Sequence, residues 1–136
     1  MTNILNSKSN NAAAPKQAMA FFEFAFRPFF LLASLFSILA LLVWDGLFTG
    51  NFSLNLYGGP LWWHMHEMLF GFAAAIIVGF LLTAVQNWTG VRSLNGKGLM
   101  LLVAVWLLAR VLFFFPTSIP DWFIALVDLA FLPISA

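Results

Sequence analysis

The chain contains no cysteine among its 136 residues. This absence excludes disulfide bonds, thiolate-ligated metal sites and the Cys-x-x-Cys-His attachment of a c-type haem. Charged residues are also scarce, at 8% of the chain, whereas soluble domains contain about 25%. The formal net charge is only +1, and nothing in it indicates a nucleic acid as partner. The two scarcities indicate a membrane protein, in which any haem would be held non-covalently.

Hydrophobic residues make up 62% of the chain and gather in four segments, at about residues 28–48, 61–85, 99–115 and 122–136. A helix needs about 20 apolar residues to cross ~30 Å of hydrocarbon. The first two segments satisfy this length, the third is marginal, and the fourth is still apolar at the last residue given. We therefore expect an all-α, polytopic transmembrane helix bundle with four spans, the fourth truncated, as the N-terminal part of a larger bundle.

Residues 1–20 are rich in Asn, Ala and Ser and contain no apolar core. They do not form a cleavable signal peptide, and we expect a disordered tail. Glu23 and Arg27 follow, four residues apart among phenylalanines, which predicts a short interfacial helix with an ion pair.

The basic residues predict how the chain is oriented. Those outside the predicted spans precede the first span or lie between the second and third, at Lys8, Lys16, Arg27, Arg92 and Lys97. The positive-inside rule therefore predicts a multi-pass protein whose N-terminus is cytoplasmic. The start of the second span then lies at the outer face.

Four ionisable residues are predicted to share one depth near the outer surface: Asp45, Glu67, Arg110 and Asp128. Arg110 and Asp128 lie on consecutive antiparallel helices. An unpaired acid at that depth costs up to about 3 kcal/mol, which favours a direct ion pair. In the alternative, Arg110 snorkels to the interface and Asp128 ends its helix early.

Small residues follow Glu67 at every fourth position, at Gly71, Ala75, Gly79 and Thr83. Such a stripe lets another helix, or a flat macrocycle, approach the backbone closely. The pattern alone favours helix–helix packing over cofactor packing.

The second span opens with two histidines and a methionine, His64, His66 and Met68. Imidazole suits haem iron, and imidazole with a thioether suits Cu(I). If the helix has begun by His64, the two rings point about 200° apart and cannot chelate one ion. If the helix begins only at His66, a joint site is possible. Structural hydrogen bonding is the alternative to either metal site.

Three blocks resemble the opening of an NnrS family protein: residues 27–32 (RPFFLL), 63–72 (WHMHEMLFGF) and 79–90 (GFLLTAVQNWTG). One departure is Gln86, which stands where a proline is usual. The resemblance implies a bacterial inner-membrane protein associated with haem, copper and nitric oxide, often linked to denitrification. It implies His64 and His66 as haem or copper ligands, whereas Met68 is a candidate copper ligand from its thioether chemistry alone. Glu67 would orient an imidazole.

The expected function is therefore the relief of nitric oxide stress, with the lipid bilayer, nitric oxide and the remaining spans of the protein as partners. The alternative is a membrane transporter or metal-handling protein whose outer polar layer lines a substrate path. In a third reading, the early spans are only a scaffold. No nucleophile, base or proton path can be assigned, so whether the protein is an enzyme stays open.

Overall fold

The computed structural model describes residues 22, 24–115 and 119–136. Every regular element in these ranges is a helix, which confirms the all-α class. The helices are α2 (Phe26–Phe48), α3 (Pro60–His66), η1 (Glu67–Ala73), α4 (Ala74–Thr89), α5 (Gly96–Leu112) and α6 (Asp121–Ser135). The predicted tail at residues 1–20 and the acid of the predicted Glu23–Arg27 pair lie outside the described residues.

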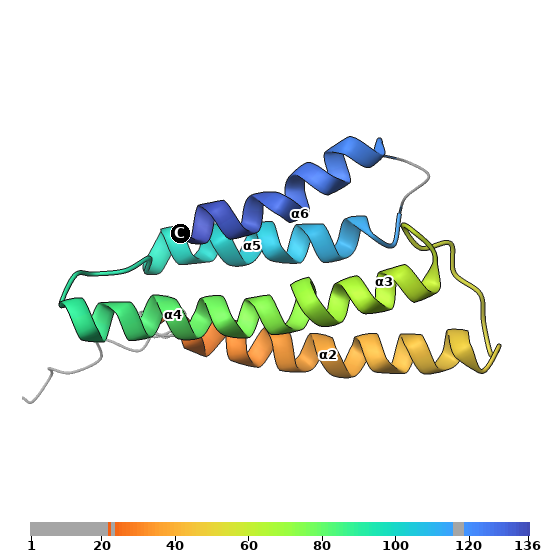
Figure 1. The fold of residues 1–136 in the computed structure, drawn as a ribbon, viewed down its shortest axis with the longest axis horizontal. Coiled ribbons are helices and arrows are strands. Elements are labelled where there is room, and N and C mark those ends of the chain that lie inside the picture. The colour runs from red at the N-terminus through yellow and green to blue at the C-terminus, as the bar shows by residue number, and fades with distance from the viewer. Residues whose placement is uncertain (1–21, 23, 116–118) are drawn as a thin grey trace, which may run out of the picture.

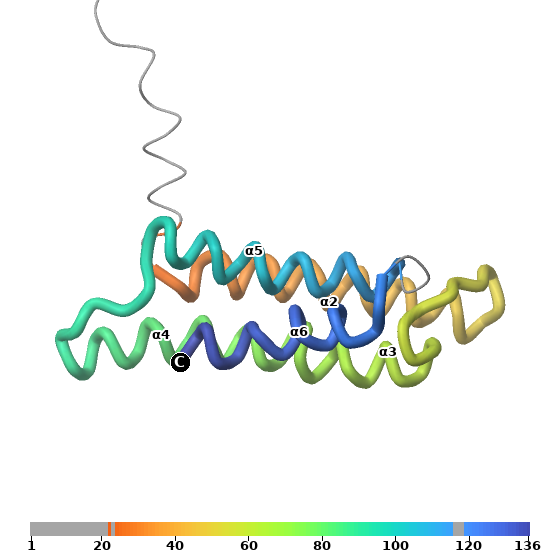
Figure 2. Tube along the Cα trace, turned by 90° about the horizontal axis from the view of Figure 1, so that it is seen from above, coloured from red at the N-terminus to blue at the C-terminus, as the bar shows by residue number. Residues whose placement is uncertain are grey.

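The helices alternate in direction and pack along their lengths as a bundle (Figure 1). The elements α3, η1 and α4 follow one another without a break and form a single long rod that lies against α2. The helices α5 and α6 form the second pair. Seen from above, α5 lies over α2 and α6 lies over the rod (Figure 2).

Within the described ranges, two helices are long and apolar enough to cross a membrane: α2 with 23 residues and the Pro60–Thr89 rod with 30. The other two are shorter, with 17 residues in α5 and 15 in α6. They fall below the ~20 residues that a perpendicular crossing needs. The structure thus supports two of the four expected spans, and the other two stay predictions.

The helix bounds differ from the expected ones mainly at the second and third spans. The rod continues four residues past the expected end at 85, to Thr89, and Gly90 follows as its C-cap with a φ of 69°. The third helix begins at Gly96 and ends at Leu112, three residues before the expected bounds at each end. Pro60 occupies the first helical position of α3, where its missing N–H costs nothing.

The small-residue stripe packs against α2, which confirms the helix–helix interpretation. A Cβ at Gly79 would lie 2.8 Å from the Cβ of Phe29, closer than side chains approach. At the same contact, the Thr83 hydroxyl accepts a hydrogen bond from the Phe26 N–H at 3.1 Å and donates one to the Gly79 carbonyl at 3.0 Å. Glycine and threonine thus bring the two backbones together.

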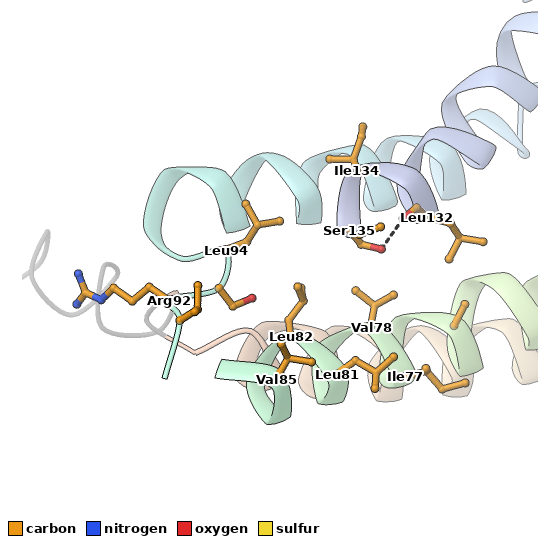
Figure 3. A pocket seen from close by; sticks show the side chains of 14 residues that line it. Ile77, Val78, Leu81, Leu82, Val85, Arg92, Leu94, Leu132, Ile134 and Ser135 are labelled. Carbon is orange, nitrogen blue, oxygen red and sulfur yellow. Dashed lines mark hydrogen bonds between the residues drawn. The ribbon is translucent and has the colours of Figure 1, made fainter. Parts of the chain in front are cut away.

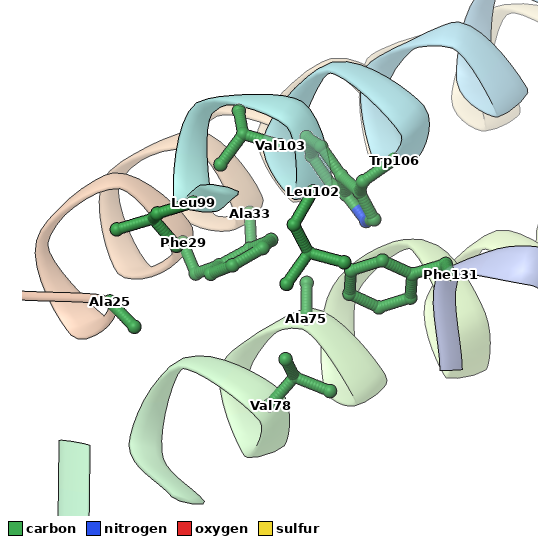
Figure 4. Close-up of a cluster of buried hydrophobic side chains, with 10 residues drawn as sticks. All are labelled: Ala25, Phe29, Ala33, Ala75, Val78, Leu99, Leu102, Val103, Trp106 and Phe131. Atoms are coloured by element: carbon green, nitrogen blue, oxygen red, sulfur yellow. The ribbon is translucent and has the colours of Figure 1, made fainter. Parts of the chain in front are cut away.

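Two apolar clusters fill the bundle interior. One gathers around Phe29, Trp106 and Phe131 (Figure 4), and the other around Trp63 and Phe113. The outer surface is also apolar, with many exposed leucines and phenylalanines, as expected where lipid replaces water. On α5, a charged residue lies between the two clusters, and it organises the site described next.

Candidate functional site

Arg110 of α5 joins two buried carboxylates from two other helices. Its Nε lies 2.8 Å from Oε2 of Glu67 at the start of η1, and its NH2 pairs with Oδ1 of Asp128 on α6. The three side chains are 4%, 0% and 6% exposed. Arg110 therefore does not snorkel to the interface, and it forms the ion pair with Asp128 that the sequence favoured. Because charges are costly inside a membrane protein, mutual pairing is what allows three of them to lie there.

His66 completes this charged cluster, which we define as His66, Glu67, Arg110 and Asp128. Its Nε2 lies 3.1 Å from Oδ2 of Asp128, within ion-pair distance. The imidazole ring stacks between Trp62 and Phe70, with ring centroids 4.8 Å apart on each side. Its position is thus fixed from three directions.

The segment that carries Glu67 is a π-helix, from Glu67 to Ala73. Two of its backbone carbonyls accept hydrogen bonds from α5: that of Gly71 from Trp106 Nε1 at 3.0 Å, and that of Phe70 from Arg110 at 3.5 Å. A Cβ at Gly71 would collide with the Glu67 carboxylate, so the glycine makes room for the buried acid. Such π-helical turns are frequent at functional sites.

Asp45 lies outside the charged cluster, although the sequence placed it at the same depth. It is exposed at the end of α2, and its carboxylate forms no ion pair with a described residue. Its backbone carbonyl accepts hydrogen bonds from the Thr49 N–H and hydroxyl. An acid at a helix end can stay hydrated and needs no buried partner.

His64 faces a different neighbour from His66. Its ring stacks on Trp44 of α2, with centroids 4.4 Å apart and planes 12° from parallel. Because α3 begins at Pro60, both histidines are on a regular helix, and the idea of one ion chelated by both is wrong. In the described part of the chain, no group of three or more histidines and acids is placed to hold a metal ion.

The two imidazoles differ in how many of their ring nitrogens have a partner in the described structure. His66 has its Nε2 at Asp128 and its ring between aromatic side chains, and its Nδ1 is buried without a hydrogen-bond partner. His64 is half-buried, its Nδ1 is buried without a hydrogen-bond partner, and neither ring nitrogen bonds a described residue. Met68, four residues after His64, packs against the apolar cluster around Trp63. His64 would therefore supply one imidazole to a haem or copper, and the other ligands would have to come from elsewhere.

Sequence reasoning missed two features of this site, the contact of His66 with Asp128 and the π-helical segment. The sequence does show an acid followed four residues later by a glycine, Glu67 and Gly71. That spacing is also typical of packing between α-helices, so it does not indicate a π-helix. An apolar stretch that forms a π-helix has no hydrophobic periodicity that separates it from an α-helix.

The fold and the cluster define a class: an all-helical membrane protein whose interior holds ionisable side chains paired across three helices. Within that class the chain belongs to the NnrS family, because the family model described as NnrS protein matches residues 20–136. A search of curated proteins and a search of solved structures each found no match.

Proposed function

We propose that this protein acts in the nitric oxide response of a bacterial inner membrane, as a haem- and copper-associated NnrS-type protein. Membership of the NnrS family over residues 20–136 supports the proposal at the level of the whole chain. The proposed topology has four spans and a cytoplasmic N-terminus, which puts His64 near the outer face. Ferrous haem or cuprous copper held there would supply a metal that binds nitric oxide.

One observation assigns the proposed metal site to a particular residue: His66 contacts Asp128 through Nε2, and His64 has no such contact. We assign His64 as the ligand, because neither of its ring nitrogens has a partner in the described fold and Trp44 holds the plane of its ring, whereas His66 has only its buried Nδ1 without a partner. His66 instead fixes Asp128 in the charged cluster. Glu67 pairs with Arg110, and no described imidazole forms a hydrogen bond with it.

The test compares His64→Ala with His66→Ala in the full-length protein. Reduced-minus-oxidised absorption spectra and metal analysis of the purified protein would detect haem and copper. We expect His64→Ala to lose a haem Soret band or the copper, and to leave cells as sensitive to nitric oxide as cells that lack the protein. Molecules of His66→Ala that fold should keep the cofactor. Cofactor that is retained in His64→Ala and lost from molecules of His66→Ala that still fold would reverse the assignment.

A transporter or metal-handling protein is the second candidate, and the buried charged cluster favours it. Ionisable residues in the interior of membrane bundles often mark a path for an ion or solute. A colourless, metal-free protein that moves a solute across vesicles would support this function over the first. Substitution of Arg110 should then abolish transport, whereas substitution of exposed Asp45 should not.

A further inference from the structure

A cleft of about 780 Å³ lies between α4, the connection after it and the last turns of α6 (Figure 3). Its walls include Leu81 and Val85 on one side and Leu132 and Ile134 on the other. The volume is within the range of ~300–1,000 Å³ typical of cavities that bind small molecules. The cleft is separate from the charged cluster, none of whose residues lines it.

The cleft has the depth of one membrane leaflet. It follows α4 from Ala74 to Val85, which at 1.5 Å per residue is about 16 Å. Half of a ~30 Å hydrocarbon core is about 15 Å. An extended acyl chain that entered from one surface would therefore reach the inner end of the cleft near the bilayer midplane.

The charge in the cleft lies at one end. Of the described residues that line it, Arg92 alone is charged, and its side chain extends outward at the end of the cleft (Figure 3). Arg92 is exposed and forms no ion pair with a described carboxylate. The hydroxyl of Ser135 is already used, because it donates to the Leu132 carbonyl at 2.7 Å.

We propose that this cleft binds one phospholipid with an anionic headgroup, whose acyl chain lies along α4 and whose phosphate pairs with Arg92. The apolar walls match the chain, and a guanidinium at the polar end is the side chain best suited to bind phosphate. The anionic lipids of the cytoplasmic leaflet would be at hand, since the connection of Arg92 is cytoplasmic in the proposed topology. This site is independent of the metal that His64 is proposed to bind.

The headgroup is tested with the full-length protein in detergent, titrated with phosphatidylglycerol or phosphatidylethanolamine and analysed by native mass spectrometry. We expect one phosphatidylglycerol per chain, and a loss of about fivefold in its affinity in Arg92→Gln, the effect of one basic residue near anionic lipid. Lys97→Gln, which removes a nearby cation that does not line the cleft, should leave the affinity unchanged. Equal losses in both variants would refute specific headgroup binding.

The acyl chain is tested by filling the cleft. Leu81→Trp places a large ring on a wall residue that is 46% exposed, and Leu101→Trp is the matched control on α5, at 62% exposed and outside the cleft. We expect Leu81→Trp to abolish binding of both lipids and Leu101→Trp to retain it. A photoreactive side chain at Val85 should label lipid in membranes. Labelling of another part of the protein in place of lipid would show that protein fills the cleft and would overturn the proposal.

Discussion

Replacement of Arg110 by leucine removes the cation that Glu67 and Asp128 share. Both carboxylates are buried, and Arg110 lies within ion-pair distance of each. Removing one partner of a buried ion pair costs about 3–5 kcal/mol, because the other charge is left without compensation. We expect Arg110→Leu to lower the free energy of unfolding by at least that amount. Such a loss is a large fraction of the total stability of a protein.

The structure also predicts how the losses combine. Asp128→Leu should cost less than Arg110→Leu, because Arg110 then keeps Glu67 as a partner. The double variant Arg110→Leu with Asp128→Leu removes both partners of the pair, so neither is left buried without the other. The losses of stability from the two single substitutions should therefore not add. A double-mutant cycle should give a coupling energy of about 1–3 kcal/mol, the range for residues in direct contact. An exchange of the two charges, with Asp at 110 and Arg at 128, should rescue only in part, since the new acid would face Glu67.

The assay is unfolding of the full-length protein in mixed micelles, followed by tryptophan fluorescence as the denaturing detergent is increased. Asp45→Leu is the matched control, because this acid is exposed and unpaired among the described residues, and its removal should change stability by less than about 0.5 kcal/mol. Additive losses at 110 and 128, or a cost at Asp45 equal to that at Asp128, would refute the reasoning.

Three further substitutions, the first with Gly98→Ala as its control, test contacts of the Pro60–Thr89 rod by the same unfolding assay. Gly71→Ala should destabilise the protein by about 1–3 kcal/mol, because the added Cβ meets the Glu67 carboxylate. Gly98→Ala is the control and should cost less, since the nearest neighbour of its Cβ is the flexible end of Leu94 at 3.1 Å. Trp106→Phe should cost about 1 kcal/mol through the lost bond to the Gly71 carbonyl, and equal stability would show that this bond contributes nothing. Thr83→Val should also cost about 1 kcal/mol, because the Phe26 N–H loses its acceptor; an unchanged stability would contradict that role.

The depth of a side chain in a helical bundle can be read from sequence, and this explains what could be predicted. Rise per residue is fixed, so residues counted from the ends of two antiparallel helices give their relative heights. Arg110 and Asp128 were placed at one level in this way, and the structure pairs them. The stripe from Gly71 to Thr83 was also predictable, because small residues at a regular interval leave few choices other than close packing.

The direction in which a side chain points is harder to predict, since it depends on which helix lies alongside and on the local helix type. Asp45 was expected in the charged layer from its height alone, but it is at the end of α2 and stays exposed. His66 was placed on a face away from His64, and nothing in the spacing showed that Asp128 of α6 would meet it there. The π-helical turn that begins one residue later adds a further change of direction that apolar periodicity does not reveal.

The separation of the two histidines bears on how the site can evolve and how it can be studied. The ring of His66 is enclosed by aromatic residues, and its Nε2 lies 3.1 Å from a carboxylate that also pairs with Arg110, so a change there disturbs three helices together. His64 touches the rest of the bundle mainly through the face of one indole, that of Trp44. Loss of function after substitution of His66 therefore does not identify a ligand, because misfolding produces the same result. Substitution of His64 perturbs little besides the imidazole. A change in the metal content of this variant therefore indicates whether His64 is a ligand.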